Sequence, residues 1–160
     1  MQTKSLFRFG LALLAAAIFA ATSARAEVLI NDDIDFNGAR IYIPCANGGN
    51  GEIAVFLGHL HVVITETVVR NKVIRNYHFQ PQGLIAVGLT TGEVYHATGE
   101  TRRTDQFDPS TGVVTEVYVN NFRIIGPGPG NNFLAHDNMR FVFDGANVYV
   151  LHEHSTADCK

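Results

Sequence analysis

The chain has 160 residues, of which 12 are basic and 15 acidic, for a net charge of −3. A chain of this length forms one domain and can bury a substantial core. Its mildly acidic composition excludes nucleic acids and anionic membranes as main partners, because both require a basic protein surface.

The N-terminal residues have the pattern of a secretory signal peptide. Lys4 and Arg8 give a positive start, Leu11–Ala21 is apolar, and Ala24-Arg25-Ala26 is a small-x-small cleavage site. The apolar run is shorter than the ~20 residues that a membrane-spanning helix needs. A retained N-terminal anchor is the alternative. We therefore expect residues 1–26 to be removed as a signal peptide.

Cleavage after Ala26 leaves residues 27–160 as the exported domain, either secreted or periplasmic, with no membrane contact. It removes Lys4, Arg8 and Arg25, so nine basic residues remain against fifteen acidic ones, a net charge of −6. A surface of this charge suits a soluble exported protein. The sequence does not indicate an oligomeric state.

Two cysteines, Cys45 and Cys159, lie near the two ends of the expected domain. In an exported chain the default is a disulfide between them, with free thiols or an intermolecular bridge as the alternative. A disulfide requires Cα atoms within about 7 Å, so the two ends should lie side by side. A meander whose first and last strands meet is a closed barrel, and the bridge would lock that seam.

From residue 34 onward, segments with strand patterns alternate with Gly, Pro and Asn turns. Gly58 interrupts one such segment and is expected to form a bulge or bend. Arg70-Asn71-Lys72 and Thr90-Thr91-Gly92 are expected turns. The expected extended segments up to residue 103 are 34–44, 52–57, 59–70, 73–80, 84–89 and 93–103, with a polar loop at 105–112.

The strongest local pattern is a long hairpin. Two runs rich in Val, Ile, Phe and Tyr, within 113–125 and 133–143, flank the turn sequence Gly126–Asn132, and a last strand begins at Asn147. Strands of about a dozen residues exceed the usual ~5–6 and favour a barrel or a strongly coiled sheet. The mature chain has no convincing helix pattern. We predict an all-β fold, a single antiparallel meander that closes into an eight- or nine-stranded barrel.

Alternation along the strands separates two faces. In 59–70 the even positions are apolar at Leu60, Val62 and Ile64, whereas the odd positions carry histidine and threonine. In 113–125 both faces are apolar, as happens when one face lines a core and the other packs on a partner, loop or ligand. The alternation alone leaves open which face points inward.

Two strings carry a resemblance to known proteins. Thr90–Gly99 (TTGEVYHATG) and Val119–Asn132 (VNNFRIIGPGPGNN), together with the penultimate Cys159, resemble a group of small exported bacterial proteins with a β-rich domain and no assigned activity. The resemblance implies compartment and fold class and supplies no catalytic residue. The strand pattern is also similar to lipocalin, streptavidin and allene-oxide-cyclase barrels. The absence of Trp argues against biotin binding, which uses Trp walls in streptavidin-like barrels.

Histidines offer a candidate metal site. Two of the seven form the pair His59 and His61, and two more form the pair His152 and His154. In a strand, residues i and i+2 share a face, so both imidazoles of a pair can reach one metal ion. The two pairs would share a site if their strands are neighbours or face each other across a lumen. Zinc or copper suits such ligands, and half-exposed strand histidines are the alternative.

A barrel lumen offers a candidate ligand site, because the mouths of β-barrels commonly bind small molecules. Asn120 and Asn121 are adjacent and poor strand formers, so they either bond backbone at a strand irregularity or face a ligand. No catalytic nucleophile motif is present. The candidate ligand-binding residues are Tyr95, Tyr118, Asn120, Phe122, Arg123 and His136.

These patterns favour an exported barrel that binds a small, largely apolar ligand, rather than an enzyme. One alternative is a histidine-ligated metal-binding protein or a cofactor-free isomerase. Another is a structural or interaction protein whose barrel is filled by its own side chains.

Overall fold

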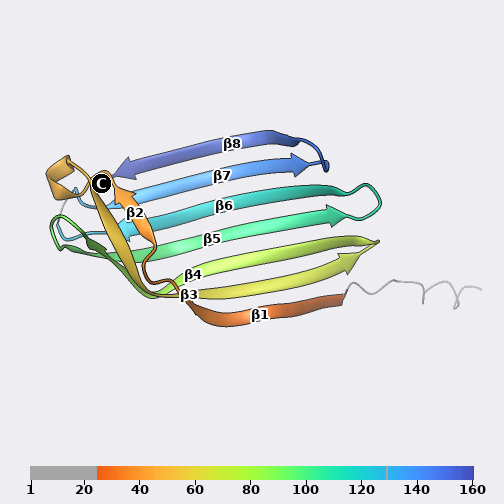
Figure 1. Ribbon diagram of the computed structural model, residues 1–160, viewed down its shortest axis with the longest axis horizontal. Helices are drawn as coiled ribbons and strands as arrows, with labels where there is room; N and C mark the ends of the chain where they lie inside the picture. Colours follow the sequence, from red (N-terminus) through yellow and green to blue (C-terminus); the bar gives the residue numbers. More distant parts are fainter. Residues whose placement is uncertain (1–24, 129) are drawn as a thin grey trace, which may run out of the picture.

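The computed structural model describes residues 25–128 and 130–160 (Figure 1). The expected signal peptide therefore lies outside the described residues, except for Arg25 and Ala26, which begin the first strand. Among the described residues, no helix is long and apolar enough to cross a membrane.

Eight strands form one antiparallel sheet, and the part of the chain that is described contains only one short 3-10 turn, Asn47–Gly49. The strand order is β1-β3-β4-β5-β6-β7-β8, with β2 paired to β3. The predicted all-β antiparallel meander is therefore confirmed from β3 to β8. The strands are β1 (Arg25–Asp35), β2 (Arg40–Ile43), β3 (Glu52–Val69), β4 (Lys72–Gly88), β5 (Val94–Asp108), β6 (Val113–Ile125), β7 (Phe133–Phe143) and β8 (Val148–Cys159).

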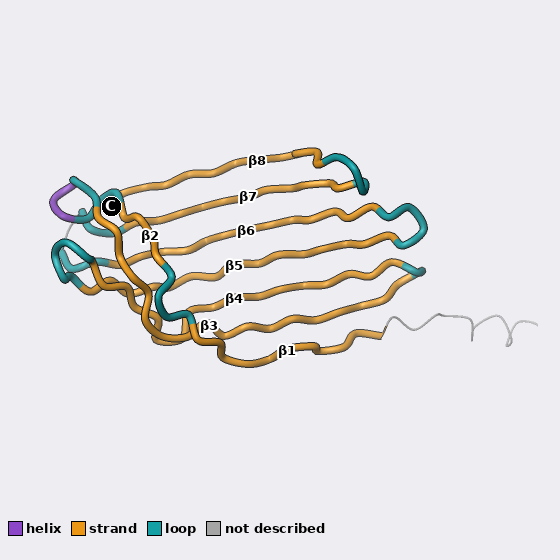
Figure 2. Tube along the Cα trace, viewed as in Figure 1, coloured by secondary structure: helices purple, strands orange, loops and turns teal. Residues whose placement is uncertain are grey.

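The prediction that this sheet closes into a barrel is wrong. Strands β1 and β8 are its two lateral edges, and each pairs with a single neighbour, β3 and β7 respectively. One edge of β3 is divided between two partners, β2 along its first part and β1 along the rest, and neither of them pairs with β8. Figure 2 shows the two edge strands on opposite sides of an open, curved sheet.

Gly58 divides β3 into two parts that run in different directions. Its φ of 125° is unfavourable for residues with a Cβ, and the register of the β3–β4 ladder shifts between Leu57 and His59. The Asn37 side chain accepts a hydrogen bond from the Gly58 N–H at 2.7 Å. The predicted bend is confirmed. Strand β2 and the first part of β3 cross over one end of the sheet, which we call the closed end (Figure 1).

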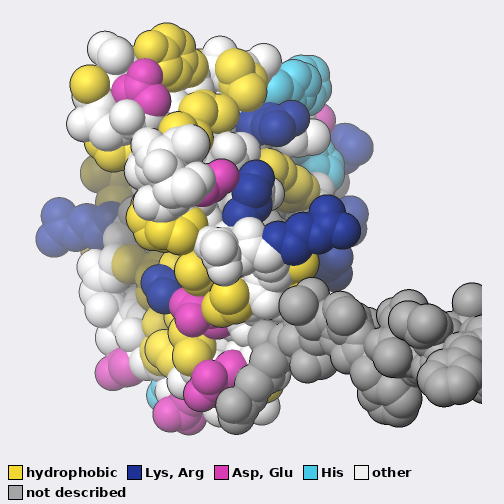
Figure 3. Space-filling view, turned by 90° about the vertical axis from the view of Figure 1, so that its right-hand side faces the viewer, with side chains coloured by type: hydrophobic (Ala, Val, Ile, Leu, Met, Phe, Trp, Pro, Cys, Tyr) yellow, Lys and Arg dark blue, Asp and Glu magenta, His cyan; other side chains and the backbone are white. Residues whose placement is uncertain are grey.

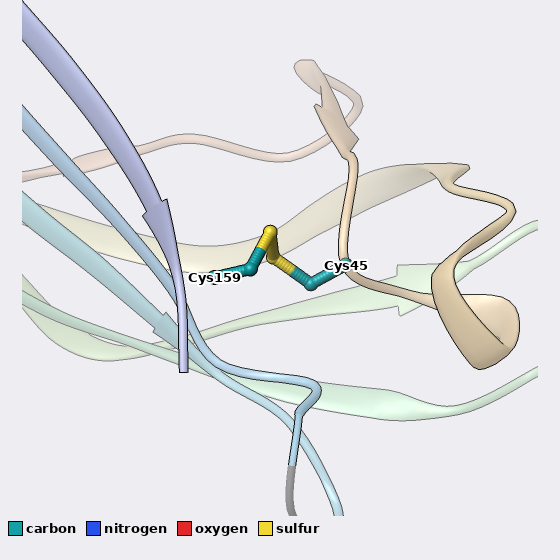
Figure 4. Close-up of a disulfide and its surroundings, with 2 residues drawn as sticks. All are labelled: Cys45 and Cys159. Carbon is teal, nitrogen blue, oxygen red and sulfur yellow. A yellow bond between two sulfur atoms is a disulfide. The ribbon is translucent and has the colours of Figure 1, made fainter.

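The hydrophobic core lies at the closed end. Ile43, Ala54, Ala86, Tyr95 and Ile124 are fully buried there. Cys45, Ala46, Phe56, Leu84 and Phe133 complete this cluster. The disulfide predicted between Cys45 and Cys159 is present, with Cα atoms 5.5 Å apart (Figure 4). It joins the loop after β2 to the end of β8, so it covers the core instead of sealing a barrel.

The sheet has an inner face, which carries the core, and an outer face. Paired residues in antiparallel strands share a face. Leu60, Val62 and Ile64 are therefore inner, with their partners Pro81, Phe79 and Tyr77. The odd positions of β3 are outer, so His61 lies beside Asp33 of β1. By the same register, all seven histidines are on the outer face: His59, His61, His78, His96, His136, His152 and His154.

The opposite end of the sheet, the free end, is not covered by β2. Its inner face ends in a row of six apolar residues, one from each of β3 to β8, which pair with one another across the strands. Three of these residues are more than 40% exposed. Figure 3 looks onto this end, where hydrophobic side chains lie among Lys and Arg. The row consists of Val68, Val73, Phe107, Val114, Phe143 and Val148.

Candidate functional site

A hollow of about 340 Å³ lies on the inner face, where the closed end meets the open part of the sheet. This volume falls in the range of about 300–1,000 Å³ that is typical of small-molecule sites. Five aromatic rings contribute to its walls. The lining residues are Phe36, Phe56, Leu60, Phe79, Pro81, Leu84, Thr101, Tyr118, Asn120 and Phe122.

One wall of the hollow is a row of phenylalanines. The ring centroids of Phe36 and Phe56 are 5.5 Å apart, and those of Phe56 and Phe122 are 5.9 Å apart in an edge-on arrangement. Such separations are favourable for aromatic pairs. Phe36 lies in the link between β1 and β2, and its N–H donates a hydrogen bond to the Gly58 carbonyl at 2.9 Å. The bend in β3 therefore positions this wall.

Beside these phenylalanines the lining is polar and belongs to one row across three strands. Thr101, Asn120 and Asp137 are partners in β5, β6 and β7. The Thr101 hydroxyl donates to Asn120 Oδ1 at 2.8 Å, and Asn120 Nδ2 donates to Asp137 Oδ2 at 2.9 Å. These bonds hold the Asn120 amide in one orientation, so the hollow has a pre-organised polar side.

Tyr118 lies beside this polar row. Burial is the main cause that raises the pKa of its phenol, and the negative charge of Asp137 adds to the effect. The neighbouring Thr101 side chain offsets part of this rise in the pKa. The hydroxyl therefore keeps its proton at neutral pH and can donate to a bound molecule.

The cationic group nearest to Tyr118 on the inner face is Arg103, its partner across β5 and β6. Its guanidinium donates to both carboxylate oxygens of Asp105, at 2.8 and 2.9 Å, and lies 3.0 Å from Glu116. It also stacks 5.3 Å from the ring centre of Tyr77. Arg103 is thus held within the sheet, and its charge is matched by neighbouring carboxylates.

The structure brings together three of the six predicted ligand-binding residues. Tyr118, Asn120 and Phe122 alternate along β6 and line the hollow. Tyr95 is instead fully buried in the core. Arg123 and His136 lie on the outer face, where His136 Nδ1 is 2.7 Å from the Asn121 side-chain oxygen.

Neither Asn120 nor Asn121 sits at a strand irregularity. The ladders that join β6 to β5 and to β7 are continuous through both residues. The backbone-bonding role expected for them is therefore not seen. Instead, each side chain bonds other side chains, Asn120 on the inner face and Asn121 on the outer face.

The structure does not bring the two histidine pairs together. His59 and His61 are on β3, His152 and His154 are on β8, and four strands lie between. At ~4.8 Å per strand, this is a separation of about 24 Å. Among residues 25–128 and 130–160, no group of three or more His, Cys, Asp or Glu side chains is placed to hold a metal ion.

A second depression, of about 470 Å³, lies on the outer face around Val63, His78 and Arg102. Its outer-face lining residues include no phenylalanine or tyrosine, whereas five such rings line the inner hollow. His78 and Arg102 both contact the Glu100 carboxylate, each at 3.0 Å. This surface is polar with paired charges, so the inner hollow is the better candidate for an apolar ligand.

Glu52 is a structural residue that sequence reasoning missed. It is only 3% exposed, and its carboxylate accepts hydrogen bonds from the Thr90 and Thr91 N–H groups, the Thr91 hydroxyl and the Tyr95 hydroxyl. Burial opposes ionisation, but these bonds outweigh it and lower the pKa of Glu52. Gly88 leaves the space that the carboxylate occupies. No sequence signal marks a glutamate as buried, because most are exposed.

Bonds to the buried Glu52 carboxylate give several residues of the string Thr90–Gly99 a structural role. The turn at Thr90-Thr91-Gly92 supplies the donors, and Tyr95 supplies the hydroxyl. Burial, followed by the bonds to Glu52 and Glu93, raises the pKa of the Tyr95 phenol. The string therefore fastens the β4–β5 turn to the core.

Comparison of the chain with protein-family models, curated proteins and solved structures finds no match.

Proposed function

We propose that the chain is an exported protein that binds a small, largely apolar molecule in the inner hollow. The observation that carries the proposal is the combination, in one concavity, of five aromatic rings with a polar row held in place by hydrogen bonds. Specific small-molecule sites usually combine apolar walls with a few placed polar groups. The ligand's apolar part would contact the phenylalanine wall, and the Tyr118 hydroxyl would meet a polar atom.

The filled-core alternative concerns a different part of the molecule. Side chains fill the closed end, where Ile43, Ala46 and Tyr95 are fully buried. The hollow lies beyond that cluster, although Phe56 and Leu84 contribute to both. A packed core at the closed end is therefore compatible with binding at its mouth, and it gives the hollow a rigid floor.

Filling the hollow should weaken binding. Thr101→Phe places a ring among the lining residues, and we expect it to weaken binding of the neutral fluorescent probe N-phenyl-1-naphthylamine by at least about tenfold. Fluorescence titration of the purified protein measures this change. Thr104→Phe is the matched control, because Thr104 lies on the same strand but faces outward. Equal probe affinity in both variants would contradict the proposal.

The identity of the natural ligand requires a separate measurement. Native mass spectrometry of protein from its native culture should show a bound species that Thr101→Phe lacks and Thr104→Phe retains. A species retained by both variants would place binding elsewhere.

Export is supported by the disulfide and by the signal-peptide pattern. We expect full-length chain produced in a bacterium with an exporting envelope to yield a periplasmic or secreted product that begins at Glu27, as determined by intact-mass measurement. Ala26→Tyr should block processing, because the cleavage site requires a small residue. An unprocessed wild-type product in the cytoplasm would contradict this expectation.

A further inference from the structure

We infer that the inner hollow admits uncharged apolar molecules and rejects apolar anions such as fatty acids and aryl sulfonates. The inference rests on the proposed function and adds the charge of the ligand to it. Its basis is the distribution of charged side chains on the inner face, which the strand register determines.

Acidic side chains outnumber basic ones on this face. Asp137 lies closest, since it accepts the hydrogen bond from Asn120 in the wall of the hollow. An anion entering the hollow would meet this carboxylate without full screening by water, so the repulsion is larger than at an exposed site. Beyond the closed end, the inner-face carboxylates are Glu27, Asp32, Glu66, Asp105, Glu116, Asp137 and Glu153, against the guanidiniums of Arg75 and Arg103.

The basic residues on this face already have acidic partners. Arg103 is bound to Asp105 and Glu116, as described above. Arg75 Nη2 is 2.6 Å from Glu66 Oε2, and its Nε also donates to that oxygen. A ligand carboxylate would have to displace one of these ion pairs to find a cation.

The polar wall is likewise suited to uncharged groups. Tyr118 keeps its proton and offers a neutral hydroxyl. Thr101 and Asn120 direct hydrogen bonds toward each other and toward Asp137. Anion sites in proteins instead present guanidinium groups or clustered backbone N–H groups. The hollow has the features of a site for a neutral molecule.

Two fluorescent probes with one skeleton test this selectivity. N-phenyl-1-naphthylamine is neutral, and 8-anilinonaphthalene-1-sulfonate adds a sulfonate to the same ring system. We expect the neutral probe to bind at least about tenfold more tightly. Because charge repulsion is screened by salt, the ratio should shrink in about 1 M NaCl.

Removing the nearest carboxylate should admit the anion. Asp137→Asn should raise the affinity for the sulfonate, relative to the affinity for the neutral probe, by about threefold to tenfold. Asp33→Asn is the control, because it removes one negative charge from the outer face, and neither affinity should change. Circular dichroism and thermal unfolding check that both variants fold.

The outcomes separate the two proposals. Equal or tighter binding of the sulfonate to the wild-type protein overturns the charge selectivity and leaves the hollow as a binding site. If neither probe binds, or if Thr101→Phe leaves neutral-probe binding intact, the proposed function itself fails. An unchanged ratio of the two probe affinities in a folded Asp137→Asn variant overturns the role of that carboxylate.

Discussion

Replacing both cysteines with alanine should lower the free energy of unfolding by about 4–5 kcal/mol. The Cys45–Cys159 bridge closes a loop with a sequence separation of 114 residues, and cross-linking a loop of that size strongly restricts the unfolded chain. Because the sheet is not closed, this covalent link is what fastens the loop after β2 to β8 over the core. Urea unfolding monitored by circular dichroism measures the change.

Reduced wild-type protein is the control for lost packing. Cys45 is only 4% exposed, so alanine at this position also removes buried volume. Wild-type protein under dithiothreitol keeps both sulfur atoms and should still lose most of the stability. If reduction leaves the urea midpoint unchanged, the bridge contributes little and the closed end is held by its core alone.

Glu52→Gln should destabilise the fold by about 2–4 kcal/mol, because buried donors would lose a charged acceptor. The two N–H groups and the hydroxyl of Thr90 and Thr91 point at the carboxylate, and an amide NH₂ facing them would repel them. Glu93→Gln is the matched control. It retains an oxygen for its bond to the Tyr95 hydroxyl, so its cost should stay below about 1 kcal/mol.

Glu52→Gln should also make the free energy of unfolding depend less on pH in the acid range. Folding lowers the pKa of Glu52, so its carboxylate stabilises the folded state above the ordinary value of 4.5, and this contribution is lost as the pH falls below that value. Glu52→Gln cannot titrate at this position and should lose less stability between pH 5 and pH 3 than the wild type. Parallel acid profiles for the two proteins would show that Glu52 has no special role.

Local sequence patterns predicted most of the strands and turns, although residues 81–83 continue β4 and residues 105–108 continue β5. The hairpin of β6 and β7, the bend at Gly58 and the turn at residues 70–72 follow from alternation and from Gly, Asn and Pro chemistry, which act over a few residues. Strand β1 was largely missed, because Asp32, Asp33 and Asp35 are poor strand formers and pairing with β3 overrides that preference. Barrel closure depends on the path of edge strands, which local patterns do not encode.

The candidate site was predicted in part for the same reason. Tyr118, Asn120 and Phe122 share a face because they alternate on one strand, so choosing them together required only local information. Phe36 reaches the hollow from the other end of the chain through the bend at Gly58, and its place depends on tertiary structure. Tyr95, Arg123 and His136 were assigned to the same site although the register distributes them between the core and the outer face.

The open sheet also determines how the protein behaves in concentrated solution. Strand β8 leaves one edge without a neighbouring strand, and its residues Val148–Leu151 are 65, 48, 54 and 57% exposed. Neither lysine nor proline interrupts this strand, whereas the opposite edge carries three aspartates. Exposed apolar edges act as templates for strands of other molecules. We therefore expect β8, more than β1, to pair with strands of other molecules in concentrated solution, whether or not the disulfide and the core keep the fold intact.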